Sequence, residues 1–198
     1  MKRSIASGVC AALLAIGTSA YASTLTQNLS WTVDRSGTST RYRITAYGDS
    51  IYAGWYGSIS RVAKRAAPLV SGEYASNTWG TDVEVIRRCK SGAVASDIYN
   101  NKIVAERSYM QSTNTRIVTF EMCGNDGLQA RSNFSGQTGT CSYSQLNTAV
   151  ANCTTYLQAA MDYINANAYS GVKLKIVSNL YYPGYDADNG LEIGRAHV

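Results

Sequence analysis

RYRITAYGDSI, residues 41–51, reads as a strand that ends in a sharp turn. Residues 41–47 alternate as a buried strand does, and Gly48 allows the chain to turn. Ser50 then stands where a helix would begin. Sheet enzymes display a nucleophilic hydroxyl in this way, at the carboxyl end of a strand. We therefore take Ser50 as the starting point for a functional interpretation.

Strand and helix patterns alternate along the rest of the chain. Further strands are predicted at 82–86, 116–122 and 173–180, and helices at 51–69, 94–110 and 144–169. The last helix has an apolar stripe formed by Leu146, Val150, Cys153, Leu157, Met161 and Ile164. This alternation indicates βαβ units. It predicts an α/β fold, a three-layer α/β/α sandwich with a mainly parallel sheet.

The amino-terminal segment reads as a targeting sequence. Lys2 and Arg3 give a basic start, an apolar stretch follows, and residues 20–22 (Ala-Tyr-Ala) resemble a cleavage site. Residues 1–22 are therefore predicted to be a signal peptide, too short and too polar to span a membrane stably. Residues 23–40 are Ser/Thr-rich and read as a lead-in segment. We expect a secreted or periplasmic protein.

The charge pattern gives little support for a nucleic-acid partner. The chain has 18 basic and 13 acidic residues over 198 positions, so removing Lys2 and Arg3 leaves 16 against 13, near +3. The basic residues are scattered, without a long run or interleaved aromatic residues. We expect no nucleic-acid binding.

Four cysteines remain after the signal peptide: Cys89, Cys123, Cys141 and Cys153. In an oxidising compartment they permit three full pairings, between which the sequence does not choose. Cys123 and Cys141 bracket a Gly/Ser/Asn-rich loop, which favours a bridge between them. The spacings contain no CxxC pair and no histidine lies nearby, so no zinc site is predicted.

Three loops that follow predicted strands carry the groups that acyl transfer requires. They contain Gly48-Asp49-Ser50, Gly92-Ala93, and residues 123–126 (Cys-Gly-Asn-Asp). A parallel sheet would bring them to one edge. There the Ser50 hydroxyl can attack an ester carbonyl, while the N–H groups of Ser50 and Gly92 and the Asn125 amide hold the oxyanion. Asp49 and Asp126 are expected to brace these loops by hydrogen bonds.

At these residues the chain resembles the SGNH hydrolase superfamily, the GDSL esterases and lipases, over about residues 41–185. The resemblance rests on Gly-Asp-Ser, an isolated Gly and Gly-x-Asn-Asp in order, with Cys123 replacing the first glycine of the third block. It implies an SGNH/flavodoxin-like fold in which Ser50 is nucleophile and first oxyanion donor, and Gly92 and Asn125 are the other donors. It also implies a monomer that cleaves a small-molecule, glycan or lipid ester without a cofactor or metal.

The fourth block of that family, Asp-x-x-His, is absent. The only histidine is His197, and Gly194 occupies the position of the required aspartate. Residues 192–198 are similar to a translated sequencing-library adapter (gag atc gga aga gca cac gtc). We therefore interpret 191–198 as an artefactual tail and 41–190 as an incomplete hydrolase domain. It would lack its last strand and helix and its catalytic aspartate and histidine, and would be nearly inactive. The alternative is a non-catalytic cell-surface or glycan-binding domain.

Overall fold

A computed structural model describes residues 28–35, 40–55, 65–135 and 142–178. Its centre is a five-stranded sheet with the strand order β1-β3-β2-β4-β5. The strands are β1 (Leu29–Val33), β2 (Arg41–Gly48), β3 (Asp82–Cys89), β4 (Thr115–Phe120) and β5 (Leu174–Val177). The pairs β2–β3, β2–β4 and β4–β5 are parallel, and only β1 runs antiparallel, beside β3.

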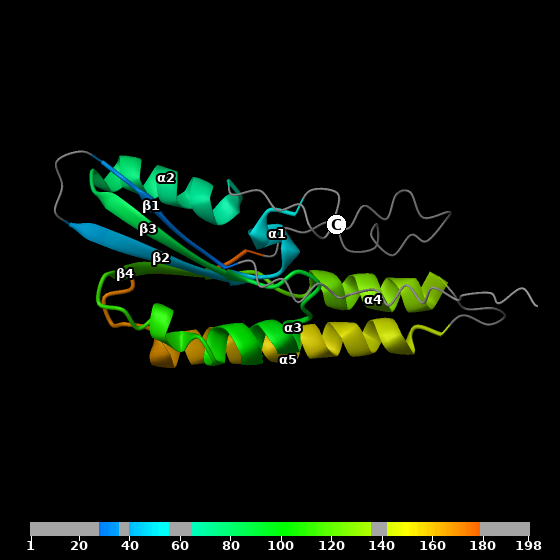
Figure 1. Cartoon of the computed structure of the whole chain (residues 1–198). Helices are drawn as coiled ribbons and strands as arrows, with labels where there is room; N and C mark the ends of the chain where they lie inside the picture. The colour runs from blue at the N-terminus through cyan, green and yellow to red at the C-terminus, as the bar shows by residue number, and fades with distance from the viewer. Residues whose placement is uncertain (1–27, 36–39, 56–64, 136–141, 179–198) are drawn as a thin grey trace, which may run out of the picture.

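Helices cover both faces of the sheet (Figure 1). One face carries α1 (Ser50–Ala53) and α2 (Ala67–Trp79). The other carries α3 (Ala95–Asp97), the π-helix η1 (Ile98–Val104) and α5 (Ser144–Asn167). The predicted three-layer α/β/α architecture with a mainly parallel sheet is therefore confirmed.

The alternation of side chains along β2 and β4 builds two cores. Ile44 and Ile117 pack with Leu69 and Val83 on the α2 face, whereas Tyr47 lies in the cluster on the other face. That second cluster also contains Val118, Phe120, Ile98, Ile103, Ala160 and Ile164. Successive residues of a strand point to opposite faces, so both cores can come from the same strands.

All four predicted strands are present, with small shifts at their ends, and β1 is an addition to them. Residues 179–180 of the last predicted strand lie outside the described residues. It lies within the segment that the sequence presented only as a lead-in. Its exposed Trp31 and Ser/Thr content hide the strand pattern, because an edge strand needs only one well-covered face.

The prediction of one helix over 51–69 was wrong. The first helix ends after Ala53, where Gly54 adopts a left-handed conformation with φ 82° and caps it. The second begins at Ala67, and Pro68 occupies its first turn, where a missing N–H costs nothing. Residues 56–64, and with them part of the predicted helix, lie outside the described residues.

The helix predicted over 94–110 is divided. A single turn of α3 passes into the π-helix η1, and a short 3-10 turn, η2 (Arg107–Tyr109), follows. A helix not predicted, α4 (Gly124–Ser135), begins where a Gly/Ser/Asn-rich loop was expected. Glycine and asparagine weaken a helix, but packing against α5 overrides that preference.

The predicted helix over 144–169 is confirmed as α5, but its apolar stripe is only partly buried. Ile164 is fully covered, whereas Val150 is 66% exposed and Met161 is 38% exposed. The amino-terminal half of α5 projects with α4 beyond the sheet, as Figure 1 shows, so that half has no strand beneath it. None of the helices in the described ranges is both long and apolar enough to cross a bilayer.

Candidate active site

The three loops singled out in the sequence follow three adjacent parallel strands. Gly48 at the end of β2 pairs with Cys89 at the end of β3, and Tyr47 pairs with Phe120 at the end of β4. The strands thus finish level with one another. The expectation that the loops meet at one edge of the sheet is confirmed.

Asp49 holds the turn that presents Ser50. Its carboxylate Oδ1 accepts a hydrogen bond from the Ile51 N–H at 2.8 Å and so caps α1. The Ser50 hydroxyl lies 3.5 Å from the same oxygen, at the outer limit of hydrogen bonding. Ser50 is half-buried, while Asp49 is only 1% exposed. The hydroxyl is thereby fixed at the start of a helix with one side still accessible.

Asn125 ties the three loops together. Its Nδ2 donates to Asp49 Oδ2 at 2.8 Å and to the Ala93 carbonyl at 2.9 Å. One amide thus joins the Ser50 turn to the Gly92 turn. Because Nδ2 carries two hydrogens, both of its donors are already engaged in this conformation.

Gly92 lies in a tight turn that is also linked to the Ser50 strand. The Ala93 N–H donates to the Lys90 carbonyl at 3.2 Å, and the Lys90 N–H donates to the Gly48 carbonyl at 3.0 Å. Gly92 has φ 77°, a left-handed conformation that L side chains rarely adopt. The isolated glycine of the sequence is therefore required by the backbone at this position.

Cys123 is bonded to Cys153 on α5, with their Cα atoms 5.3 Å apart. The favoured Cys123–Cys141 bridge was wrong, because the turn after β4 places Cys123 against the facing helix. Cys123 has φ 83° and is the one non-glycine residue with positive φ in the described ranges. Glycine would adopt this conformation without strain. Cys89 is a free, buried thiol, and Cys141 lies outside the described residues.

Asp126 braces the site from the first turn of α4. Its Oδ2 accepts the Ala95 N–H at 2.8 Å, which connects α4 to the start of α3. Burial raises the pKa of Asp126, although the Ala95 N–H opposes that rise. The expectation that Asp49 and Asp126 hold loops by hydrogen bonds is confirmed.

Glu121 is a member of this network that sequence reasoning missed. It follows β4 directly, is 4% exposed, and its Oε2 accepts the Asp49 N–H at 3.0 Å. Burial and the neighbouring Asp49 carboxylate raise its pKa to about 10. A lone acidic residue between Phe120 and Met122, at the end of an apolar strand, was the signal that could have identified it.

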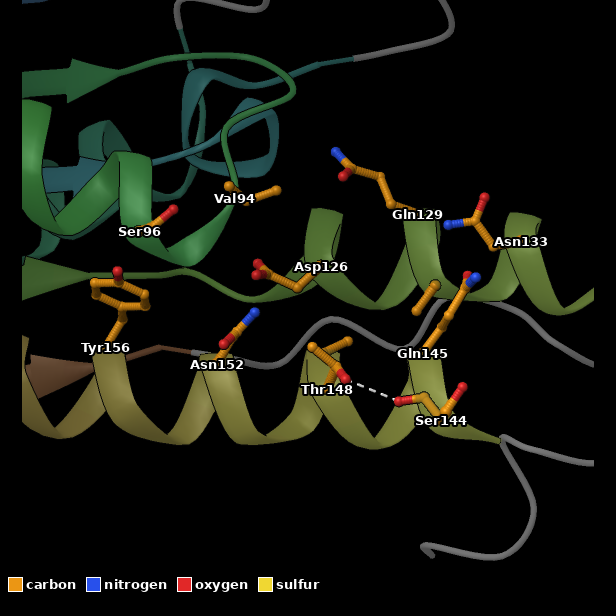
Figure 2. Close-up of a pocket in the computed structure, with 12 residues that line it drawn as sticks. Val94, Ser96, Asp126, Gln129, Asn133, Ser144, Gln145, Thr148, Asn152 and Tyr156 are labelled. Atoms are coloured by element: carbon orange, nitrogen blue, oxygen red, sulfur yellow. Dashed lines mark hydrogen bonds between the residues drawn. The ribbon is translucent and has the colours of Figure 1, made fainter. Parts of the chain in front are cut away.

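A cavity of about 380 Å³ lies between α4, α5 and the loop before α3. Figure 2 shows Asp126 near the middle of the lining, with polar side chains from both helices around it. Four of these are amides, namely Gln129, Asn133, Gln145 and Asn152, and none makes a hydrogen bond to another described residue. Ser50 does not line this cavity, although Val94 and Asp126 lie next to the loops that the Asn125 amide joins.

The fold is similar to that of solved lipases. A lipase from a goat rumen metagenome superposes with a TM-score of 0.58 at 18% identity, over 78% of this chain and 70% of that one. An extracellular lipase from Streptomyces rimosus gives a TM-score of 0.47 at 24% identity, over 78% of this chain and 68% of that one. Phospholipase A1 from Streptomyces albidoflavus gives a TM-score of 0.44 at 16% identity, over 68% of this chain and 58% of that one.

No protein-family model matches the sequence, and no curated protein matches it significantly. The assignment therefore rests on architecture, above all on the superposition with the rumen lipase. That superposition agrees with the strand order and with the three level loops described above. The chain therefore shares the fold of the rumen lipase.

Proposed function

We propose that this protein is an exported serine hydrolase that cleaves carboxylic esters through an acyl-enzyme on Ser50. The observation that carries the proposal is the Asn125 amide, which lies 2.8 Å from the carboxylate that caps the Ser50 helix and 2.9 Å from the carbonyl next to Gly92. The nucleophile and the two other expected oxyanion donors are thus held in one hydrogen-bonded unit.

In the proposed reaction the Ser50 hydroxyl attacks the ester carbonyl. The N–H groups of Ser50 and Gly92 and the Asn125 amide would donate to the resulting oxyanion, each such donor being worth about 2.7–4 kcal/mol of the barrier. Asn125 can do so only if Nδ2 gives up or shares one of its present bonds. Its bond to the Ala93 carbonyl is the one that can change without disturbing the carboxylate that caps α1.

The proposed general base, a histidine oriented by an aspartate, would be encoded beyond about residue 190, as the interpretation of residues 191–198 as an artefactual tail implies. Leu174 and Ile176 on the edge strand β5 are 51% and 41% exposed, as expected if a further strand and helix covered them. Without that histidine, Ser50 would lack its general base. Loss of this kind costs up to about 10⁶ in rate, so the chain as it stands would be nearly inactive.

Export and substrate class follow from the same proposal. The Cys123–Cys153 bridge supports an oxidising compartment, as the signal peptide proposed at 1–22 requires. The substrate would be a small-molecule, glycan or lipid ester, bound by a monomer that needs no cofactor or metal. Serine chemistry requires neither.

The test compares ester hydrolysis by three proteins: the 198-residue chain, a longer chain carrying the gene's own continuation, and that longer chain with Ser50→Ala. Only the second is expected to hydrolyse a panel of aryl, glycan and lipid esters. Full activity in the 198-residue chain, or in the Ser50→Ala variant, would exclude this mechanism. A continuation that encodes no Asp-x-x-His would exclude it as well.

A second candidate is a non-catalytic cell-surface domain that binds glycans. It is favoured by the cavity between α4 and α5, whose four amides bond no other described side chain and offer both donors and acceptors to a neutral, hydroxyl-rich ligand. Titration with neutral oligosaccharides, followed by NMR, would test it. Binding that disappears in Asn133→Ala and Asn152→Ala but persists in Ser50→Ala supports this candidate, and absence of binding across the panel excludes it.

A further inference from the structure

Glu121 is buried behind the Ser50 turn, where no substrate can touch it. Its backbone N–H continues the sheet by donating to the Tyr47 carbonyl at 3.1 Å. Its side chain points toward the turn after β2, and its Oε2 accepts the Asp49 N–H at 3.0 Å. The Asp49 carboxylate lies close enough to raise the pKa of Glu121. Two acidic side chains thus meet inside the protein.

A buried pair of this kind is stable only when it shares a proton. Asp49 already accepts two N–H donors, one from Ile51 and one from Asn125. Burial and the Asp49 charge raise the pKa of Glu121, while N–H groups of Asp49 and Tyr52 only partly oppose this. The proton therefore resides on Glu121, which can donate it to Asp49.

We propose that Glu121, as a neutral carboxylic acid, is the positioning residue that sets both the Ser50 turn and the Asn125 amide. One oxygen accepts the Asp49 N–H and the other donates O–H to the Asp49 carboxylate. Asp49 is then held at its backbone and at its side chain together. Because Asp49 caps α1 and accepts from Asn125, its position fixes the nucleophile and the third oxyanion donor.

The titratable groups around Glu121 are those that can change its protonation. Asp49 faces it from the turn after β2, Tyr52 from α1, and the buried Cys89 thiol from the end of β3. Asp126 lies one step further, near Asp49. Arg87 and Lys102 also act on the buried Cys89 thiol.

A neutral carboxylic acid has a close isostere in glutamine, whose amide also offers an acceptor oxygen and a donor group, NH₂, in the same plane. Glu121→Gln should therefore keep the arrangement of Asp49 and Asn125. Glu121→Leu has a similar length but offers neither group. It leaves the Asp49 N–H and one carboxylate lone pair without partners in a buried site. Comparing the two variants therefore shows whether Glu121 acts through its hydrogen bonds or only by filling space.

The experiment uses the full 198-residue chain and needs no catalysis. Carbon-13 NMR of the glutamate carboxyl groups should show Glu121 protonated at neutral pH. The side-chain NH₂ signals of Asn125 should be the same in wild type and Glu121→Gln. In Glu121→Leu they should shift, and their hydrogen exchange should be about tenfold faster or more.

If Glu121 is ionised at neutral pH in the wild-type protein, the proposal is wrong. This measurement needs no variant, so it remains decisive even if Glu121→Leu does not fold. Unchanged Asn125 signals in a folded Glu121→Leu would overturn the proposal as well. The positioning role matters to hydrolysis only if the proposed function holds. The two can fail separately, because the NMR signals report geometry even in a chain with no activity. In an active longer chain, Glu121→Leu should lower kcat with little change in KM.

Discussion

Gly48 and Glu121 approach so closely that a Cβ on Gly48 would lie 2.3 Å from Glu121 Oε2. The same Cβ would lie 2.9 Å from the Tyr52 Cβ. Gly48 is not among the residues with positive φ, so its backbone would accept another side chain. The glycine of the Gly-Asp-Ser block is needed here for space, and the carboxyl of Glu121 occupies that space.

Replacing this glycine should therefore destabilise the protein through crowding. Gly48→Ala must displace the Glu121 carboxyl and the first turn of α1, and overpacking of this kind costs about 1–3 kcal/mol. Gly80→Ala is a suitable control, since its Cβ would meet no atom within 4 Å and only its φ of 64° is unfavourable. Urea denaturation measures both. A Gly48→Ala variant as stable as wild type would contradict the packing described.

Glu121 should make the stability of the wild-type protein depend on pH. Because its folded pKa is raised from 4.5 to about 10, the folded state holds a proton that the unfolded state loses within this window. Stability then falls as pH rises through the window, by at most about 1.4 kcal/mol per unit for one proton. Glu121→Gln removes this pH dependence, so the stability of the variant relative to wild type should increase from about pH 5 to about pH 9. Parallel stability curves for the two proteins would refute the assignment.

Cys123 should affect stability in two separable and opposite ways, through its bridge and through its backbone conformation. Closing a loop of 30 residues in the unfolded chain is worth about 3–4 kcal/mol. Cys123 is also held at φ 83°, which costs a non-glycine residue about 1–2 kcal/mol. The double variant Cys123→Gly/Cys153→Ala should therefore be less stable than wild type but more stable than Cys123→Ala/Cys153→Ala. Equal stability of the two double variants would show that the backbone at 123 relaxes once the bridge is gone.

The Cys89 thiol should not react with alkylating reagents in the folded protein. It is fully buried, and burial raises the pKa of its thiol well above the usual value. An alkylating reagent at neutral pH should leave it unmodified until the chain unfolds, as followed by peptide mass spectrometry. Cys89→Ser identifies the peptide. Modification at the same rate with and without denaturant would show that the core between β2 and β3 opens readily.

The sequence predicts the sheet better than the helices for a physical reason. The strands around Ile44 and Val118 are buried on both faces, so their apolar composition reveals them. The helix boundaries depend instead on single residues such as Gly54 and Pro68, whose effects a periodic pattern averages away. Likewise α4 forms because α5 lies beside it, and its own residues do not favour a helix.

The sequence likewise predicts some residues of the candidate site and not others. Ser50, Gly92 and Asn125 belong to short motifs with fixed spacing, so they could be found in the chain itself, and their proposed roles still require measurement. Glu121 belongs to no such motif. Its importance arises from its distance to Asp49, which lies 72 positions earlier in the chain. The same holds for Cys153, whose partner depends on how α5 packs.

The neutral Glu121 also changes how the protein would behave in an electric field. The formal net charge of the chain is +5 when every carboxyl group is counted as ionised. Folding takes up one proton at neutral pH, so the native protein carries one positive unit more than the same chain in urea. Native and denaturing electrophoresis would then separate wild type from Glu121→Gln differently: the two would migrate alike when folded and apart when unfolded.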